Sequence, residues 1–276
     1  MKKFEGILIC TDLDGTLLRN DKTISEENLK AIEYFKSEGG IFTFNTGRLP
    51  CMTTKFYDIV KPNAPACSLN GAGIYDIEAG EYILKYPLSR SYTELLESVN
   101  EALPDVGYLL FAFYQEHVCK ENEEVLNYRR VKNVSAPVTD YREIEEDIAK
   151  ILLVIKAGDE ELMAKAAELL DRHPKADEFD FIRSELTLYE ILPKDVSKGK
   201  LLLKLADILN VDIKNTYAIG DYNNDVSMLK VAGVGIAVAN ATEEAKAAAD
   251  FVTVSNEDDA IARVIYGIEK GEFKKQ

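Results

Sequence analysis

The chain has 276 residues, of which 46% are hydrophobic and 29% are charged, and its formal net charge is −15. This composition is typical of a globular protein with a sizeable core, and the negative charge disfavours binding to nucleic acid or to anionic membrane surfaces. No run reaches the roughly 20 apolar residues that span a bilayer, and acidic residues soon follow the Lys2-Lys3 start, unlike in a signal peptide. We expect a cytoplasmic protein that binds any anionic ligand through local cations.

The first third of the chain alternates short apolar runs with amphipathic stretches. The runs 7–11, 41–45 and 66–69 predict buried strands, and a helical pattern over 25–39 separates the first two. Short, fully apolar strands separated by helices are typical of a parallel sheet that is covered on both faces.

The same alternation returns in the last third of the chain. It predicts strands over 216–220, 235–238 and 251–254, with helices over 198–210, 226–231 and 242–249 and from about 258 onward. We therefore expect both ends of the chain to form one α/β domain with a doubly wound, Rossmann-like parallel sheet, made of residues 1–82 and 193–276.

The intervening segment 83–192 has a different pattern. Helical patterns over 92–103 and 160–172 alternate with aromatic and aliphatic strands. The runs 179–182 and 186–192 are nearly adjacent, which predicts an antiparallel hairpin. This segment is expected to be an inserted α+β domain.

Four polar clusters lie at the ends of predicted core strands or at the start of a core helix. They are Asp12-Leu13-Asp14-Gly15-Thr16, Thr46-Gly47-Arg48, Lys198-Gly199, and Gly220-Asp221-Tyr222-Asn223-Asn224-Asp225. In an open parallel sheet, ligands bind beyond the carboxyl ends of the strands. We expect these distant segments to meet in one crevice.

Four carboxylates would meet there, those of Asp12, Asp14, Asp221 and Asp225. Several negative charges within a few ångströms repel one another strongly unless protons or a cation neutralise them. Oxygen ligands suit a hard divalent ion, and Mg²⁺ bound by few carboxylates commonly takes a substrate phosphate oxygen as a further ligand. The pattern therefore predicts Mg²⁺ as the cofactor and a small phosphorylated metabolite as the substrate.

The chemistry of these residue types suggests roles for several of them. Asp12 is the candidate nucleophile, which would form an aspartyl phosphate that water hydrolyses. Asp14 would protonate the leaving oxygen and later deprotonate the attacking water. The Thr46 hydroxyl, the Gly47 backbone N–H and the Lys198 ammonium would donate to the phosphoryl oxygens.

With these four motifs in this order, the chain resembles the haloacid dehalogenase superfamily of phosphatases, in the Cof-like group of subclass IIB. The resemblance covers essentially the full length. It implies that segment 83–192 is a cap domain that closes over the crevice and contributes substrate contacts. It also implies that Asp14 binds Mg²⁺ through its backbone carbonyl, that Asp221 is a metal ligand, and that Asn224 and Asp225 are supporting polar positions. We count Asn224 as a candidate substrate-binding residue and Asp225, with Asp12, as a candidate metal ligand.

The same resemblance matches Arg48 and Asn70 to positions that commonly face the site, so we count both as candidate substrate-binding residues. Asn45 departs from the family, which more often has a small residue before the Thr-Gly-Arg step. That departure is expected to alter the pocket rather than the chemistry.

Two other functions fit the same residues. One is a phosphomutase or phosphotransferase, in which the aspartyl phosphate passes to a second acceptor instead of to water. The other is a regulatory protein that is phosphorylated in a carboxylate pocket without efficient turnover, as a receiver domain is. The presence of Asp14 beside Asp12 favours an enzyme over the regulatory protein.

Overall fold

The protein consists of two compact units in a computed structural model that describes residues 2–132 and 135–274. The first unit combines the residues up to Leu84 with those from Ser197 onward, and the second is Lys85–Val196. No helix among the described residues combines the length and the hydropathy of a membrane span.

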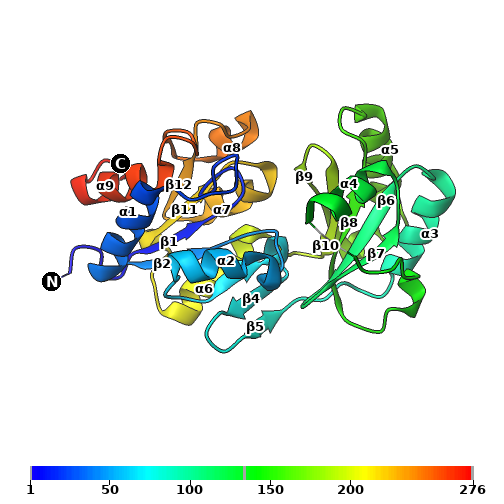
Figure 1. Cartoon of the computed structure of the whole chain (residues 1–276), viewed down its shortest axis with the longest axis horizontal. Helices are drawn as coiled ribbons and strands as arrows, with labels where there is room; N and C mark the ends of the chain where they lie inside the picture. Colours follow the sequence, from blue (N-terminus) through cyan, green and yellow to red (C-terminus); the bar gives the residue numbers. More distant parts are fainter. Residues whose placement is uncertain (1, 133–134, 275–276) are drawn as a thin grey trace. The chain divides into compact units, whose positions relative to one another are not determined.

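A five-stranded parallel sheet forms the centre of the first unit (Figure 1) and confirms the predicted α/β fold class. Its order is β13-β12-β11-β1-β2. The strands are β1 (Leu8–Thr11), β2 (Ile41–Phe44), β11 (Thr216–Gly220), β12 (Val234–Ala237) and β13 (Phe251–Val252). Because β1 lies between β2 and β11, Cys10 is paired with Thr43 on one side and with Ala218 on the other. The first and last thirds of the chain thus share the middle of one sheet.

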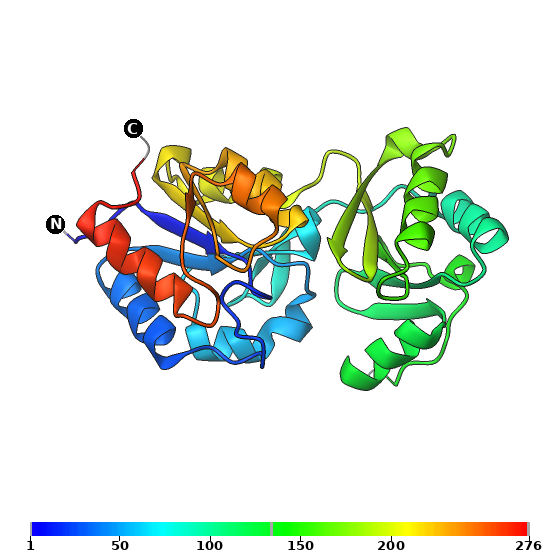
Figure 2. The same cartoon turned by 90° about the horizontal axis from the view of Figure 1, so that it is seen from above.

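Helices cover both faces of this sheet. They are α1 (Glu26–Ser37), α2 (Pro50–Val60), α6 (Lys198–Leu209), α7 (Val226–Val231), α8 (Glu243–Ala248) and α9 (Ala260–Lys270). Figure 2 shows α1, α2 and α9, drawn in blue and red, on the opposite side of the sheet from the yellow α6 and α7. The buried Asn28 side chain of α1 accepts the backbone N–H of Ala262 in α9 at 2.9 Å, which joins the two ends of the chain.

Two features of this unit differ from the sequence-based prediction. The pattern does not predict α2, because the buried stripe of this helix begins with Pro50 and Thr53 rather than with large apolar residues. The third predicted strand is the short β3 (Ala66–Ser68), which pairs antiparallel with β4 (Gly73–Asp76) in a separate sheet that also contains β5 (Glu81–Lys85). An isolated parallel bridge from Cys67 to Asn45 links β3 to the central sheet.

The second unit is built on an antiparallel sheet of order β7-β6-β8-β10-β9. Its elements are β6 (Gly107–Ala112), β7 (Glu116–Lys120), β8 (Ile148–Val154), β9 (Phe179–Glu185), β10 (Leu188–Pro193), α3 (Tyr92–Ala102), α4 (Glu123–Lys132) and α5 (Glu160–Asp171). The strands β9 and β10 form the predicted hairpin. Side chains such as Leu96 of α3, Ala166 of α5 and Ile151 of β8 belong to one buried apolar cluster.

Candidate active site

Asp12 lies directly after β1, where the backbone turns away from the sheet. Its N–H still donates to the Ile219 carbonyl of β11 at 2.9 Å, so the start of the turn is held in register. Lys198 is the first residue of α6, whose N-cap is Ser197. The fully buried Lys198 Nζ donates to Asp12 Oδ1 and to Asp225 Oδ1, both at 2.6 Å. One ammonium therefore joins the turn after β1 to the loop after β11.

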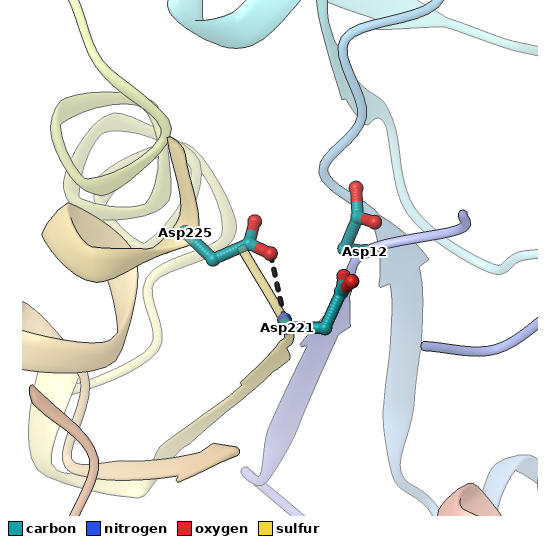
Figure 3. A group of neighbouring side chains, drawn as sticks. All are labelled: Asp12, Asp221 and Asp225. Carbon is teal, nitrogen blue, oxygen red and sulfur yellow. Dashed lines mark hydrogen bonds between the residues drawn. The ribbon is translucent and has the colours of Figure 1, made fainter. Parts of the chain in front are cut away.

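Asp225 uses both of its carboxylate oxygens within this loop and toward α6. Oδ1 accepts from Lys198, and Oδ2 accepts the backbone N–H groups of Asp221 at 2.9 Å and of Tyr222 at 3.1 Å. Figure 3 shows the bond from the Asp221 N–H to Asp225. The side chain of Asp225 is completely buried and fixes the loop that carries Asp221.

The carboxylates of Asp12, Asp221 and Asp225 form a group in which one oxygen from each residue lies within 4.8 Å of the other two. Thr16 Oγ1 donates to Asp221 Oδ1 at 2.9 Å. Gly15 packs against the same carboxylate: with φ of +78°, its position favours glycine, and a Cβ there would lie 2.4 Å from Asp221 Oδ2. Among the described residues, no hydrogen bond reaches Asp12 Oδ2 or Asp221 Oδ2, so these two oxygens remain for a ligand.

The electrostatics of this group fit a divalent cation. Burial raises the pKa of Asp12 well above its usual value; the Lys198 ammonium opposes this, and the neighbouring carboxylates add to it. Burial and the charge of Asp225 raise the pKa of Asp221 to about 7. Three ionised carboxylates and one ammonium leave two negative charges in excess. A hard ion with oxygen ligands, such as Mg²⁺, would neutralise that excess.

Asp14 is predicted to bind Mg²⁺ through its backbone carbonyl, and its carboxylate lies outside this three-carboxylate group. Arg48 donates to it twice, from Nε to Oδ2 at 2.6 Å and from Nη2 to Oδ1 at 2.7 Å, and Lys22 Nζ donates to Oδ1 at 2.8 Å. Burial by itself would raise the pKa of Asp14, but the hydrogen bonds and charges of Arg48 and Lys22 outweigh it and hold that pKa far below its usual range. The two carboxylates of the Asp-x-Asp motif thus have opposite environments.

The remaining candidate residues gather around the loop after β2. The Asn70 N–H donates to the Thr46 carbonyl at 3.2 Å, and Thr46 Oγ1 accepts the Arg48 N–H at 3.2 Å. A Cβ on Gly47 would lie 2.8 Å from Asn70 Nδ2, and Asn224 Nδ2 donates to Asn70 Oδ1 at 3.0 Å. Asn224 Oδ1 is buried without a hydrogen-bond partner among the described residues. The structure therefore brings all the predicted polar clusters into one part of the first unit.

Three residues with contacts at this site were not among the candidates. Thr16 bonds Asp221 and stands inside the Asp-x-Asp-Gly-Thr motif, so the motif itself contained the signal. Asn45 Nδ2 donates to the Lys198 carbonyl at 2.9 Å and ties β2 to the start of α6, which explains a polar residue at this position. Lys22 contacts Asp14 from a loop that no motif indicates.

Several known proteins are similar to this chain over almost its whole length. Residues 9–265 match the family model for haloacid dehalogenase-like hydrolases. The chain is 30% identical over 270 residues to the 5-amino-6-(5-phospho-D-ribitylamino)uracil phosphatase YitU of Bacillus subtilis (strain 168), with 94% of this chain and 96% of the relative covered. It is 28% identical over 279 residues to the phosphatase YwpJ of the same organism, with 94% and 98% covered. The crystal structure of a haloacid dehalogenase-like hydrolase from Bacteroides thetaiotaomicron matches the fold with a TM-score of 0.81 at 26% identity and covers 95% of this chain and 99% of its own.

Proposed function

This chain belongs to the haloacid dehalogenase-like hydrolases and is a phosphatase, and we propose that it hydrolyses small phosphate monoesters with Mg²⁺ through an aspartyl phosphate on Asp12. The observation that carries this proposal is the group of three carboxylates around the buried Lys198, with its two excess negative charges and two available oxygens. Such a group is costly to bury unless a cation binds it.

Asp12 is oriented for nucleophilic attack. Lys198 holds Oδ1, which leaves Oδ2 to attack phosphorus while the ester P–O bond breaks. Asp14, in its protonated form, gives its proton to the leaving alkoxide. Water then attacks the phosphorus of the aspartyl phosphate and loses a proton to Asp14, which releases phosphate and restores both carboxyl groups.

Asp221 would hold Mg²⁺ through Oδ2, which no protein donor reaches, and the Asp12 oxygen that does not attack phosphorus would be a second ligand. When bound, the ion supplies positive charge to the phosphoryl oxygens. We assign Asp225 a positioning role, because its oxygens already accept from Lys198 and from the backbone of the loop.

The phosphoryl group would be held by donors from separate elements. Lys198 uses two of its three N–H donors on Asp12 and Asp225, and we assign the third to a phosphoryl oxygen. The Thr46 hydroxyl and the Gly47 N–H would donate to the others, and Asn70 and Asn224 support that loop.

Asp14 needs a change of partner before it can act as an acid. In the described conformation it is the ionised partner of Arg48, held by two parallel hydrogen bonds. This ion pair has to open, at least in part, when a substrate oxygen reaches Asp14. Arg48 is therefore placed to contact the substrate only after this exchange.

The second unit, Lys85–Val196, is proposed to serve as the cap domain that selects the substrate. The relative that acts on a phosphorylated ribitylaminouracil makes polyol and sugar phosphates the first compounds to try. Phosphorylated cofactors such as pyridoxal phosphate extend that panel.

The test is phosphate release from this panel, with Mg²⁺ or EDTA, by the native protein and by the Asp12→Asn variant. Removal of the nucleophile should lower metal-dependent release by at least about 1000-fold. The matched control is Asp58→Asn, at an exposed aspartate of α2, which should keep the native rate. Full activity in a folded Asp12→Asn variant would refute the covalent mechanism, and an isomerised phosphosugar product would indicate a phosphomutase instead.

A further inference from the structure

Lys22 stands in a tight turn that follows the Asp-x-Asp-Gly-Thr motif. The Arg19 N–H donates to the Thr23 carbonyl at 2.9 Å, and the Lys22 N–H donates to the Arg19 carbonyl at 2.9 Å. The φ of Lys22 is +63°, in the left-handed region that glycine and asparagine adopt at lower cost than lysine. The chain thus places a long cationic side chain where the backbone favours a different residue.

The turn is anchored firmly to the C-terminal part of the same unit. The buried Asn256 Nδ2 donates to the Leu18 carbonyl at 2.9 Å, and the Asn20 N–H donates to Glu257 Oε1 at 2.7 Å. Asp21 Oδ1 also accepts the N–H and the hydroxyl of Thr23, which closes the turn around Lys22. The position of the Lys22 backbone is therefore set by several contacts outside its own side chain.

The two cations at Asp14 differ in exposure and in how far their N–H donors are already used. Arg48 is only 15% exposed and spends its guanidinium on both oxygens of Asp14 and on the Met52 carbonyl. Lys22 is 50% exposed, and its described contact with Asp14 uses one of its three N–H donors. Together, Asp14, Arg48 and Lys22 carry one positive charge in excess, next to the place where the leaving group would lie.

We propose that Lys22 is a specificity-determining residue that binds an anionic group on the leaving part of the substrate, close to the ester oxygen. This inference rests on the proposed function, in which Asp14 contacts the leaving oxygen. A proton donor lies about 3 Å from that oxygen, and Lys22 Nζ lies 2.8 Å from Asp14. An anion within about 6 Å of the ester oxygen, or two to four bonds away, is thus within reach of Lys22. The favoured class is phosphate monoesters whose alcohol carries a nearby carboxylate or second phosphate.

The test compares two substrates of similar size, phosphoglycolate, which has such a carboxylate, and 2-hydroxyethyl phosphate, which is neutral at that end. The variants are Lys22→Asn, which suits the left-handed backbone and removes the ammonium, and Lys22→Arg, which keeps a positive charge. The matched control is Lys61→Asn, because Lys61 also has a left-handed φ, of +50°, but caps the far end of α2. Any effect of relieving backbone strain is therefore present in the control.

We expect the native protein to prefer phosphoglycolate in kcat/KM and the Lys22→Asn variant to lose about tenfold or more of that preference. Removing the bond from Lys22 to Asp14 can change the rate with both substrates, so the inference is read from the ratio of the two kcat/KM values. Lys22→Arg should keep most of the preference, and Lys61→Asn should match the native protein. If turnover of a probe is too slow, the same comparison is made on Kd in the Asp12→Asn background.

Three results would overturn the inference: no preference in the native protein, an equal loss on both substrates in Lys22→Asn, or no loss on either. An equal loss would assign Lys22 to the support of Asp14 alone. Failure of the proposed function is distinguishable, because it appears as phosphate release that survives the Asp12→Asn substitution whatever residue stands at position 22.

Discussion

Each unit of the protein buries a lysine, and the two lysines differ in the charges around them. In the second unit, Lys150 of β8 donates to Glu190 Oε2 of β10 at 2.9 Å, and Ser184 Oγ donates to the other oxygen of Glu190. Lys150 and Glu190 are 4% and 2% exposed, so this is a buried pair of one cation and one anion. In the first unit, Lys198 is fully buried beside the carboxylates of Asp12 and Asp225. A third carboxylate, that of Asp221, has an oxygen within 4.8 Å of one oxygen of each.

A buried charge by itself therefore does not indicate a functional site. A balanced buried pair satisfies its own hydrogen bonds and needs nothing further, although it adds little net stability. The group around Lys198 is unbalanced by two charges, and burial raises the pKa of Asp12 and of Asp221. An excess that the chain cannot neutralise is what indicates a bound cation.

The largest expected effect comes from removing the lysine of the unbalanced group. Lys198→Met should lower phosphate release by about 1000-fold or more, because it removes both a phosphoryl donor and the partner that orients Asp12. It should also lower the free energy of unfolding in EDTA by about 3–5 kcal/mol, since buried carboxylates lose their counter-charge. Phosphate release and urea unfolding measure the two effects, and a variant that keeps the native rate would contradict this role of Lys198.

Substitutions in the balanced pair of Lys150 and Glu190 should affect stability only. Glu190→Gln should cost about 3 kcal/mol in the free energy of unfolding, because it leaves Lys150 charged and buried without a counter-ion. The double variant Lys150→Met with Glu190→Leu should recover most of that loss, since apolar side chains can replace a balanced pair. Urea unfolding of Lys150→Met, of Glu190→Leu and of the double variant gives the coupling. If the double variant loses as much free energy of unfolding as the two single variants lose together, the pair is not a self-contained unit.

The smallest expected effect is a dependence of stability on pH in the absence of metal. The pKa of Asp221 is about 7 in the folded protein and 3.8 as the ordinary value. Its stabilising contribution is therefore fully present below about pH 4 and is lost as the pH rises through about 7. Thermal unfolding in EDTA should show about 1 kcal/mol less stability at pH 8 than at pH 6 from this group.

Mg²⁺ and the substitution Asp221→Asn should both change this dependence on pH. Added Mg²⁺ should stabilise the protein more at pH 8 than at pH 6, because protons and the cation compete for the same carboxylates. Asp221→Asn should remove most of both effects. A metal-free native protein whose stability is equally high at the two pH values would contradict the assignment of Asp221 to a strained, charge-excess group.

Local patterns in the sequence were enough to predict the fold class, and the comparisons confirm the family resemblance. Short apolar strands and amphipathic helices are local patterns, so their order along the chain predicted a Rossmann-like core interrupted by an α+β segment. The same order placed polar clusters such as those of Asp12, Thr46 and Asp221 after strands of that sheet. Parallel strands direct their carboxyl ends to one edge, which is why these clusters lie together in the structure.

The pairing of charges in the site depends on contacts between residues that are far apart in the sequence. Lys198 and Asp12 are 186 residues apart, and Asn70 and Asn224 are 154 apart, so no local periodicity relates them. The sequence does not indicate that the Asp14 carboxylate pairs with Arg48, or that the Asp225 carboxylate accepts from Lys198 and from the backbone of its own loop. The contacts of Lys22 and Asn45 likewise depend on which distant elements pack beside them. Residue type fixes what a side chain can bind, but its partner is chosen by three-dimensional packing.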